Sequence, residues 1–217
     1  MSCDPLTEPL VVLLAGGQSR RMLGQDKALV EIAGLRMIDR VLERLEPQAG
    51  TLWLSASHDY GTGLPCIADE ALGPPGPVGA IRAVAAKLAQ QGGDSFVTCP
   101  VDAPFVPDDL VARLTAHRPP GMAEADGALQ PVFASWSARA VLEALTPDRC
   151  HEHWSLRRLG EQLGMRAVDF PDPRALMNVN TPQELDAARA QAAVEQGKRL
   201  GATGSTRYSA SGKPKTL

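Results

Sequence analysis

The feature that most constrains this chain is an uninterrupted apolar run over residues 10–15, which stops at the pair Gly16-Gly17. A run of this length and composition is typical of a strand buried on both faces of a parallel sheet. Glycine permits a turn with positive φ and, because it has no Cβ, lets a ligand approach the backbone closely. The stretch therefore predicts a buried central strand followed by a ligand-binding loop.

The residues after this pair are small, polar and then basic, and they include Arg21 and Lys27. Backbone N–H groups exposed beside Arg and Lys form a site for a polyphosphate. The loop differs from the Walker pattern, because Gly24 is followed by Gln25 instead of a Lys and a Ser or Thr. It also lacks the G-x-G-x-x-G spacing of dinucleotide sites. We interpret it as a nucleotide loop of another class.

Composition sets the limits on organisation and partners. The 217 residues predict one nucleotide-binding domain over residues 1–195 and a basic, Gly- and Ser-rich tail over 196–217 that we expect to be disordered. The net charge of −3 gives no general attraction to nucleic acid or to a membrane. The beginning of the chain lacks a signal-peptide pattern. Four scattered cysteines indicate reduced thiols and a cytoplasmic location.

Strand and helix patterns alternate along most of the chain. A helical stripe over residues 37–45 lies between extended segments at 10–15 and 51–55, and a further clear strand covers 95–99. Two extended pieces around residues 121–134 are expected to pair antiparallel, and 165–170 to form an edge strand. The pattern predicts a single three-layer α/β/α, Rossmann-like domain with a mainly parallel sheet.

Asp102 follows the strand over 95–99 and lies between Pro100 and Pro104. In open α/β sheets ligands bind beyond the carboxyl ends of the strands, and a carboxylate there suits Mg²⁺. The alternative is that Asp102 only caps the next helix, but Asp108 and Asp109 are better placed for that. We predict a role for Asp102 in binding a metal or in substrate chemistry.

Asn178 and Asn180 lie on the same side of an extended segment near the end of the domain. The residues that follow, from Thr181 to Glu184, are explained by helix capping. Capping does not explain the two asparagines, which we therefore predict to face a ligand. The pair His151 and His153 could ligate a metal, but no other ligand lies at useful spacing in the sequence. The two histidines are better interpreted as polar residues on the protein surface.

Three motifs in this order are similar to those of one enzyme family. They are Leu14-Ala15-Gly16-Gly17 with the basic residues through Lys27, the P-x-D-x-P turn around Asp102, and Asn178-Val179-Asn180-Thr181-Pro182. Together they resemble nucleotidyltransferases, and most of all the molybdenum cofactor guanylyltransferases. The resemblance spans residues 10–188.

The resemblance implies transfer of GMP from GTP to the phosphate of molybdopterin, with release of pyrophosphate and with Mg²⁺ as cofactor. It implies catalytic roles for Arg21, Lys27 and Asp102, the last of which would hold the metal. Gln130, Asn178 and Asn180 would contact substrate. The nucleotide-binding residues would be Leu14, Ala15, Gly16, Gly17, Lys27, Asp69, Pro77, Gly79 and Asp102.

The same resemblance implies further partners. These are molybdopterin or its molybdenum-loaded form, proteins that supply it, and apo-molybdoenzymes that receive the product. The chain is expected to be a monomer or a weak oligomer. Gly17 favours guanine over cytosine, because cytidylyl-transferring relatives typically have L-A-A-G at this point.

Departures from the family pattern keep two alternatives open. Leu23 and Ala80 replace glycines, and Ser55 and Ser57 replace asparagines of some relatives. The first alternative is cytidylyl or sugar-1-phosphate transfer on the same fold. The second is a non-catalytic nucleotide-binding or cofactor-binding module.

Overall fold

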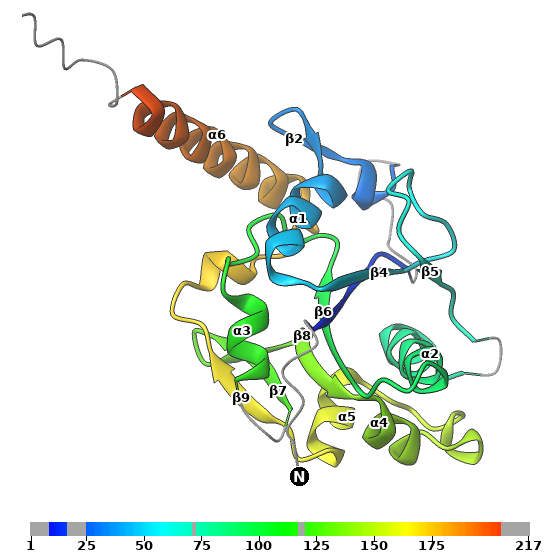
Figure 1. Cartoon of the computed structure of the whole chain (residues 1–217). Helices are drawn as coiled ribbons and strands as arrows, with labels where there is room; N and C mark the ends of the chain where they lie inside the picture. Colours follow the sequence, from blue (N-terminus) through cyan, green and yellow to red (C-terminus); the bar gives the residue numbers. More distant parts are fainter. Residues whose placement is uncertain (1–8, 17–24, 71–72, 117–119, 205–217) are drawn as a thin grey trace, which may run out of the picture.

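A mixed seven-stranded sheet, in the order β5-β4-β1-β6-β8-β7-β9, forms the centre of the molecule (Figure 1). The computed structural model describes residues 9–16, 25–70, 73–116 and 120–204, with side chains to residue 197. The strands of this sheet are β1 (Leu10–Leu14), β4 (Thr51–Ser55), β5 (Cys66–Ile67), β6 (Ser95–Pro100), β7 (Gly121–Ala125), β8 (Ala128–Ser137) and β9 (Arg166–Asp169).

The sheet has a parallel half and a mixed half. β1 lies between β4 and β6 and is parallel to both, and β5 continues the parallel order beyond β4. β8 is antiparallel to β6 and to β7. β7 and β8 are joined by Asp126 and Gly127, which both have positive φ and so form the turn that suits a two-residue hairpin. β9 completes the edge parallel to β7, so the predicted strands are confirmed.

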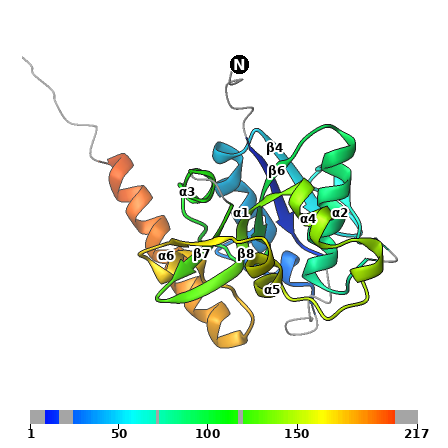
Figure 2. The same ribbon diagram turned by 90° about the horizontal axis from the view of Figure 1, so that it is seen from below.

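Helices cover both faces of the sheet, as Figure 2 shows from below. Alternation along β1 explains this: Val11 and Leu13 contribute to one buried cluster, while Leu10 and Val12 contribute to the other. The helices are α1 (Met37–Leu45) and α3 (Leu110–Thr115) on the first face, and α2 (Pro77–Gln90), α4 (Ala138–Ala144) and α5 (Leu156–Gln162) on the second. The predicted three-layer arrangement is confirmed.

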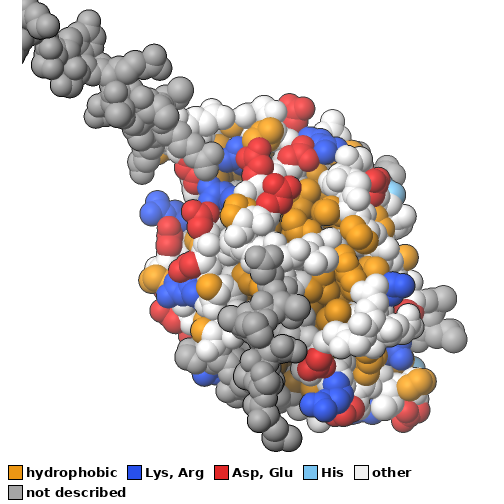
Figure 3. Space-filling view, viewed as in Figure 1, with side chains coloured by type: hydrophobic (Ala, Val, Ile, Leu, Met, Phe, Trp, Pro, Cys, Tyr) orange, Lys and Arg blue, Asp and Glu red, His pale blue; other side chains and the backbone are white. Residues whose placement is uncertain are grey.

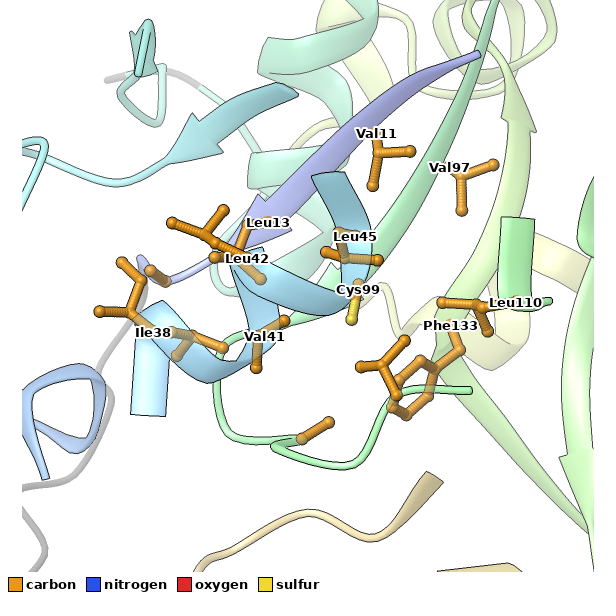
Figure 4. Packing of buried hydrophobic residues seen from close by; sticks show 14 of the residues in the cluster. Val11, Leu13, Ile38, Val41, Leu42, Leu45, Val97, Cys99, Leu110 and Phe133 are labelled. Atoms are coloured by element: carbon orange, nitrogen blue, oxygen red, sulfur yellow. The ribbon is translucent and has the colours of Figure 1, made fainter. Parts of the chain in front are cut away.

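The packing of α1 shows how the sequence pattern becomes a buried face. Ile38, Val41 and Leu45 are fully buried, and they point toward the side chains of β1 and β6 (Figure 4). Burying an aliphatic side chain of this size stabilises a fold by roughly 1.5–3 kcal/mol. Arg36 precedes the helix and is paired with Asp39 in its first turn.

A third buried cluster attaches the last helix, α6 (Pro182–Gly204), to a small hairpin of β2 (Glu31–Ile32) and β3 (Leu35–Arg36). The helix α6 continues through residues 196–204 of the expected tail as far as Gly204 and projects from the body (Figure 1). Glu195 accepts from Arg44 of α1 at 2.8 Å, which holds the helix near that point, and each further residue adds one helical hydrogen bond. Residues 205–217 lie outside the described part.

Short helical turns complete the chain: η1 (Lys27–Leu29), η2 (Glu46–Gln48), η3 (Pro147–Arg149) and η4 (Pro173–Leu176). None of the described helices has the length and hydrophobicity to cross a membrane. On the face drawn in Figure 3, hydrophobic side chains gather over the middle, and basic and acidic side chains are interspersed around them. This face therefore presents no broad field of one sign.

Candidate active site

The carboxyl ends of β1, β4 and β6 meet at one edge of the sheet and are held together there by backbone hydrogen bonds. The N–H of Ala15, after β1, donates to Ser55 at 3.0 Å, and the N–H of Val101, after β6, donates to Leu14 at 3.0 Å. A Cβ on Gly16 would lie only 3.0 Å from the carbonyl oxygen of Ser55. Gly16 is thus needed for close packing at the start of the predicted loop.

Lys27, Asp102 and Asn180, which we call the Lys27 group, meet at this edge. The Lys27 ammonium lies 3.2 Å from Asp102 Oδ2 and also donates to Asn180 Oδ1. Only 11% of the Lys27 side chain and 17% of the Asp102 side chain are exposed. The three come from the turn η1, the segment after β6 and the segment before α6. A cation, a carboxylate and an amide therefore converge, and the side chains of the cation and the carboxylate are largely shielded from water.

The segment that carries the asparagines is bound to the segment that carries Asp102. The N–H of Val179, between Asn178 and Asn180, donates to the backbone carbonyl of Asp102 at 2.7 Å. Asn178 Oδ1 is buried, and none of the described residues donates to it. A buried polar atom without a donor costs roughly 1–3 kcal/mol, so Asn178 is a strong candidate to contact a ligand.

The predicted cap of α6 forms and fixes the Asn180 backbone. Glu184 N–H donates to Thr181 Oγ1 at 3.2 Å, while Glu184 Oε2 accepts from the N–H groups of Thr181 at 2.8 Å and Asn180 at 2.7 Å. These hydrogen bonds lower the pKa of the Glu184 carboxyl, and the bond from Asn180 has the largest effect. The first turn of α6 thereby fixes the backbone of the segment that carries the two asparagines. At α3 the N-cap is Asp109, as predicted, but its side chain makes no capping bond.

A second part of the edge is formed by the β5–α2 connection. Asp69 follows β5 and is exposed on one side, and partial burial raises the pKa of its carboxyl. Pro77 is the first residue of α2, a position that suits its fixed φ. A Cβ on Gly79 would lie 2.1 Å from the carbonyl oxygen of Pro74, so the backbone requires glycine there. Among the described residues, no hydrogen bond connects this part to the Lys27 group.

The remaining predicted site residues fall into two groups. Gln130 lies in β8 opposite Ala123 of β7. Because β8 is antiparallel to β6, the first half of β8 lies at the end of the sheet that carries Asp102. Gly17 and Arg21 lie outside the described residues.

Sequence reasoning missed Tyr60. Its hydroxyl donates to Asp26 Oδ2 at 2.8 Å and lies 3.4 Å from the Ala15 carbonyl oxygen. Nothing in the sequence around Tyr60 marks it, because these partners are 34 and 45 residues away. Only the packing of the loop after β4 against η1 brings them together.

His151 and His153 are exposed, and no group of three or more metal-ligating side chains occurs among the described residues. Nearby, Arg158 donates to the His153 carbonyl and to Glu152, at 2.5 and 2.7 Å. Its guanidinium lies 4.3 Å from the ring centre of Trp154. These partners engage Arg158 within its own loop.

A mainly parallel α/β sheet with cationic and acidic side chains at its carboxyl edge is an arrangement in which open α/β proteins bind ligands, as nucleotidyltransferases do. The model of the MobA-like NTP transferase domain matches residues 11–165. The chain belongs to this family, and within it to the molybdenum cofactor guanylyltransferases.

Relatives and solved structures agree with this assignment. Molybdenum cofactor guanylyltransferases of Cereibacter sphaeroides and Vibrio cholerae are 38% and 37% identical, over 83% and 80% of this chain and 94% and 88% of theirs. The structure of molybdopterin-guanine dinucleotide biosynthesis protein A from Archaeoglobus fulgidus is similar, with a TM-score of 0.64, 21% identity, and coverage of 85% of this chain and 99% of that one. This similarity shows that the two proteins share a fold.

Proposed function

We propose that this enzyme transfers GMP from GTP to the terminal phosphate of molybdopterin and releases pyrophosphate. The observation that carries the proposal is the convergence of Lys27, Asp102 and Asn180 at the carboxyl edge of the sheet, in a chain of the guanylyltransferase family. A phosphate oxygen of molybdopterin attacks the α-phosphorus of GTP in line. The bond to the bridging oxygen of the β-phosphate breaks, and its electrons leave with pyrophosphate.

Transfer of this kind depends on positioning and on stabilisation of charge. The triphosphate lies along the segment from Gly16 to Lys27. The ammonium of Lys27, together with Arg21, offsets charge on the phosphates and on the departing pyrophosphate. Backbone N–H groups near Gly16 and Gly17 bind phosphate oxygens. No covalent enzyme intermediate is required.

Asp102 is the residue proposed to hold Mg²⁺. Its carboxylate is largely shielded and lies at the edge where the phosphates are expected. Mg²⁺ is commonly held by one or two carboxylates together with substrate phosphates and water, so this donor set fits. When bound, the ion would neutralise charge on the phosphate oxygens.

The other predicted residues are assigned to the two substrates. Asp69, Pro77 and Gly79 contact the nucleoside, with Leu14 and Ala15 at the end of the central strand beside it. Asn178, Asn180 and Gln130 contact molybdopterin. Proteins that supply molybdopterin and apo-molybdoenzymes that receive the product are the proposed partners, and the proposed location is the cytoplasm.

The test combines a binding and a transfer measurement. A ligand that binds only the folded state raises Tm with concentration, so Tm is measured against GTP, CTP and ATP with and without Mg²⁺. Transfer is followed with α-labelled GTP and molybdopterin. A Mg²⁺-dependent shift with GTP and a labelled dinucleotide product would support the proposal. Preference for CTP would move the enzyme to cytidylyl transfer, and binding without any transfer would indicate a cofactor-binding module.

A further inference from the structure

Tyr60 connects two elements of the carboxyl edge. Its hydroxyl donates to Asp26 Oδ2 at 2.8 Å and lies 3.4 Å from the carbonyl oxygen of Ala15. Ala15 is fixed in the sheet by its bond to Ser55. Asp26 is the N-cap of η1, the turn that begins with Lys27. Tyr60 therefore ties the turn that carries Lys27 to the end of the central strand.

Both carboxylate oxygens of Asp26 are engaged. Oδ1 accepts from the N–H of Ala28 at 3.0 Å, and Oδ2 accepts from Tyr60. The two bonds set the orientation of the carboxylate, and through the cap they set the backbone on either side of Lys27. From that backbone the Lys27 side chain reaches Asp102 and Asn180. The position of the ammonium thus depends on the Asp26 cap.

The loop after β4 holds Tyr60 in place. Asp59 accepts from the N–H groups of Gly61 and Gly63 at 3.0 and 3.2 Å, and Arg36 donates to the Tyr60 carbonyl at 2.7 Å. Tyr60 has a φ of 54°, in the left-handed region that bulky residues rarely adopt. Such a conformation persists only where the surroundings determine it. Tyr60 as a whole is only 9% exposed.

The Tyr60 hydroxyl stays a donor. Burial, and then the Asp26 carboxylate, raise its pKa well above the ordinary value, so it keeps its proton at physiological pH. We propose that Tyr60 is a positioning residue for nucleotidyl transfer, which acts through Asp26 to fix the ammonium of Lys27 at the carboxyl edge of the sheet. Its effect on catalysis rests on the proposed function, whereas its effect on the Asp26 cap does not.

Tyr60→Phe removes the hydroxyl and keeps the ring. Because a hydrogen bond to a charged acceptor is lost, the KM for GTP should rise about tenfold with a smaller change in kcat. A merely structural role would instead lower the amount of folded enzyme, and so kcat, at unchanged KM. His58→Ala is the matched control, because the exposed His58 ring contacts the Tyr60 ring but makes no bond to Asp26. It should leave KM unchanged.

A double-mutant cycle tests the route through Asp26. In the Asp26→Ala background, Tyr60→Phe should have no further effect on the KM for GTP. A second tenfold increase in that background would overturn the proposal, because Tyr60 would then act by another route.

Hydrogen exchange without nucleotide separates this inference from the proposed function. The N–H of Leu29 donates to the Asp26 carbonyl at 3.0 Å and that of Val30 to the Lys27 carbonyl at 3.2 Å. These amides and that of Ala28 should exchange faster in Tyr60→Phe than in wild type or His58→Ala. Unchanged exchange would overturn the positioning role. Faster exchange in an enzyme that does not use GTP would leave that role intact and contradict the proposed function.

Discussion

Two groups of charged side chains in this molecule have similar chemistry and different organisation. The Lys27 group joins a cation, a carboxylate and an amide whose members lie 75 and 153 residues apart in sequence. The second, which we call the Trp154 group, consists of Arg149, Glu152, Trp154 and Arg158, all within one loop and the helix that follows it. Both arginines pair with Glu152, and both guanidinium groups lie within 5 Å of the Trp154 ring centre, at 4.9 and 4.3 Å.

The two groups differ in whether polar atoms remain available to bind a ligand. In the Trp154 group each charge has a local partner, and the Trp154 ring N–H donates to the Arg149 carbonyl at 3.0 Å. Such a group fixes the path of its loop. The Lys27 group lies at the carboxyl edge, and Asn178, two residues before Asn180, has a buried side-chain oxygen that receives no hydrogen bond from the described residues. Convergence of distant segments around an incompletely bonded atom indicates a site for a ligand.

The strongest test of this contrast is Asp102→Asn. The substitution keeps the size of the side chain and an oxygen that can accept from Lys27, but removes the charge proposed to hold Mg²⁺. We expect GMP transfer to fall on the order of 10³-fold, while GTP binding persists in a thermal-shift titration. Asp108→Asn, at a side chain that is 91% exposed, is the control and should leave the rate unchanged. A normal rate in Asp102→Asn would show that the metal assignment is wrong.

Lys27→Met should reduce kcat/KM by about 10²-fold, because it removes the ammonium that offsets phosphate charge. It should also lower the free energy of unfolding by roughly 1–3 kcal/mol, since Asp102 loses its ionic partner in a shielded site. Steady-state kinetics and urea unfolding measure the two effects. Lys27→Arg keeps the charge, but a planar guanidinium does not fit in place of an ammonium, so we expect it to restore little activity. Full activity in Lys27→Arg would contradict the proposed geometry.

Much of the fold follows from local patterns. The apolar run of β1, the stripe of α1 and the cap of α6 each depend on residues close in sequence, and each occurs where it was predicted. The place of Asp102 follows from a general rule, because it closely follows β6 and ligands bind beyond the carboxyl ends of parallel strands. Lys27 is predicted instead from the basic residues that follow Gly16. The sequence therefore predicts these two members of the candidate site.

Two features could not be predicted in this way. Tyr60 acquires its contacts with Asp26 and Ala15 only when the loop after β4 packs against η1, and no periodic or capping pattern marks such packing. The helical course of residues 196–204 is not evident from composition, which does not reveal the contact of Glu195 with Arg44 of α1. In both cases tertiary contacts decide the local structure.

Trp154→Leu tests whether the Trp154 group stabilises the fold without taking part in substrate binding. It removes the ring that contacts both arginines and the donor to the Arg149 carbonyl. We expect a loss of about 2–3 kcal/mol in the free energy of unfolding, measured by urea unfolding. The kcat/KM per folded molecule should remain at the wild-type value. A large rise in KM with unchanged stability would instead assign the Trp154 group to substrate binding.

The smallest expected effects are a pH dependence of stability that Glu152 and Glu184 share and a difference in activity between their variants. The hydrogen bond from Arg149, and then that from Arg158, lower the pKa of Glu152, and backbone N–H groups lower that of Glu184. A carboxyl whose pKa is lower in the folded state contributes stability above its ordinary pKa of 4.5, and this contribution disappears as the pH falls. Glu152→Ala and Glu184→Ala should therefore each lower Tm at pH 7 and approach the wild-type Tm in acid.

Activity separates the two variants. Glu184 holds the Asn180 backbone, so its loss should raise the KM for molybdopterin a few-fold, in line with one lost hydrogen bond of about 1 kcal/mol. Within the described part of the chain, the Glu152 side chain bonds to its own loop and the helix that follows it, so Glu152→Ala should leave that KM unchanged. An equal change of the KM for molybdopterin in both variants would contradict the view that the Lys27 group forms a binding site while the Trp154 group stabilises the fold.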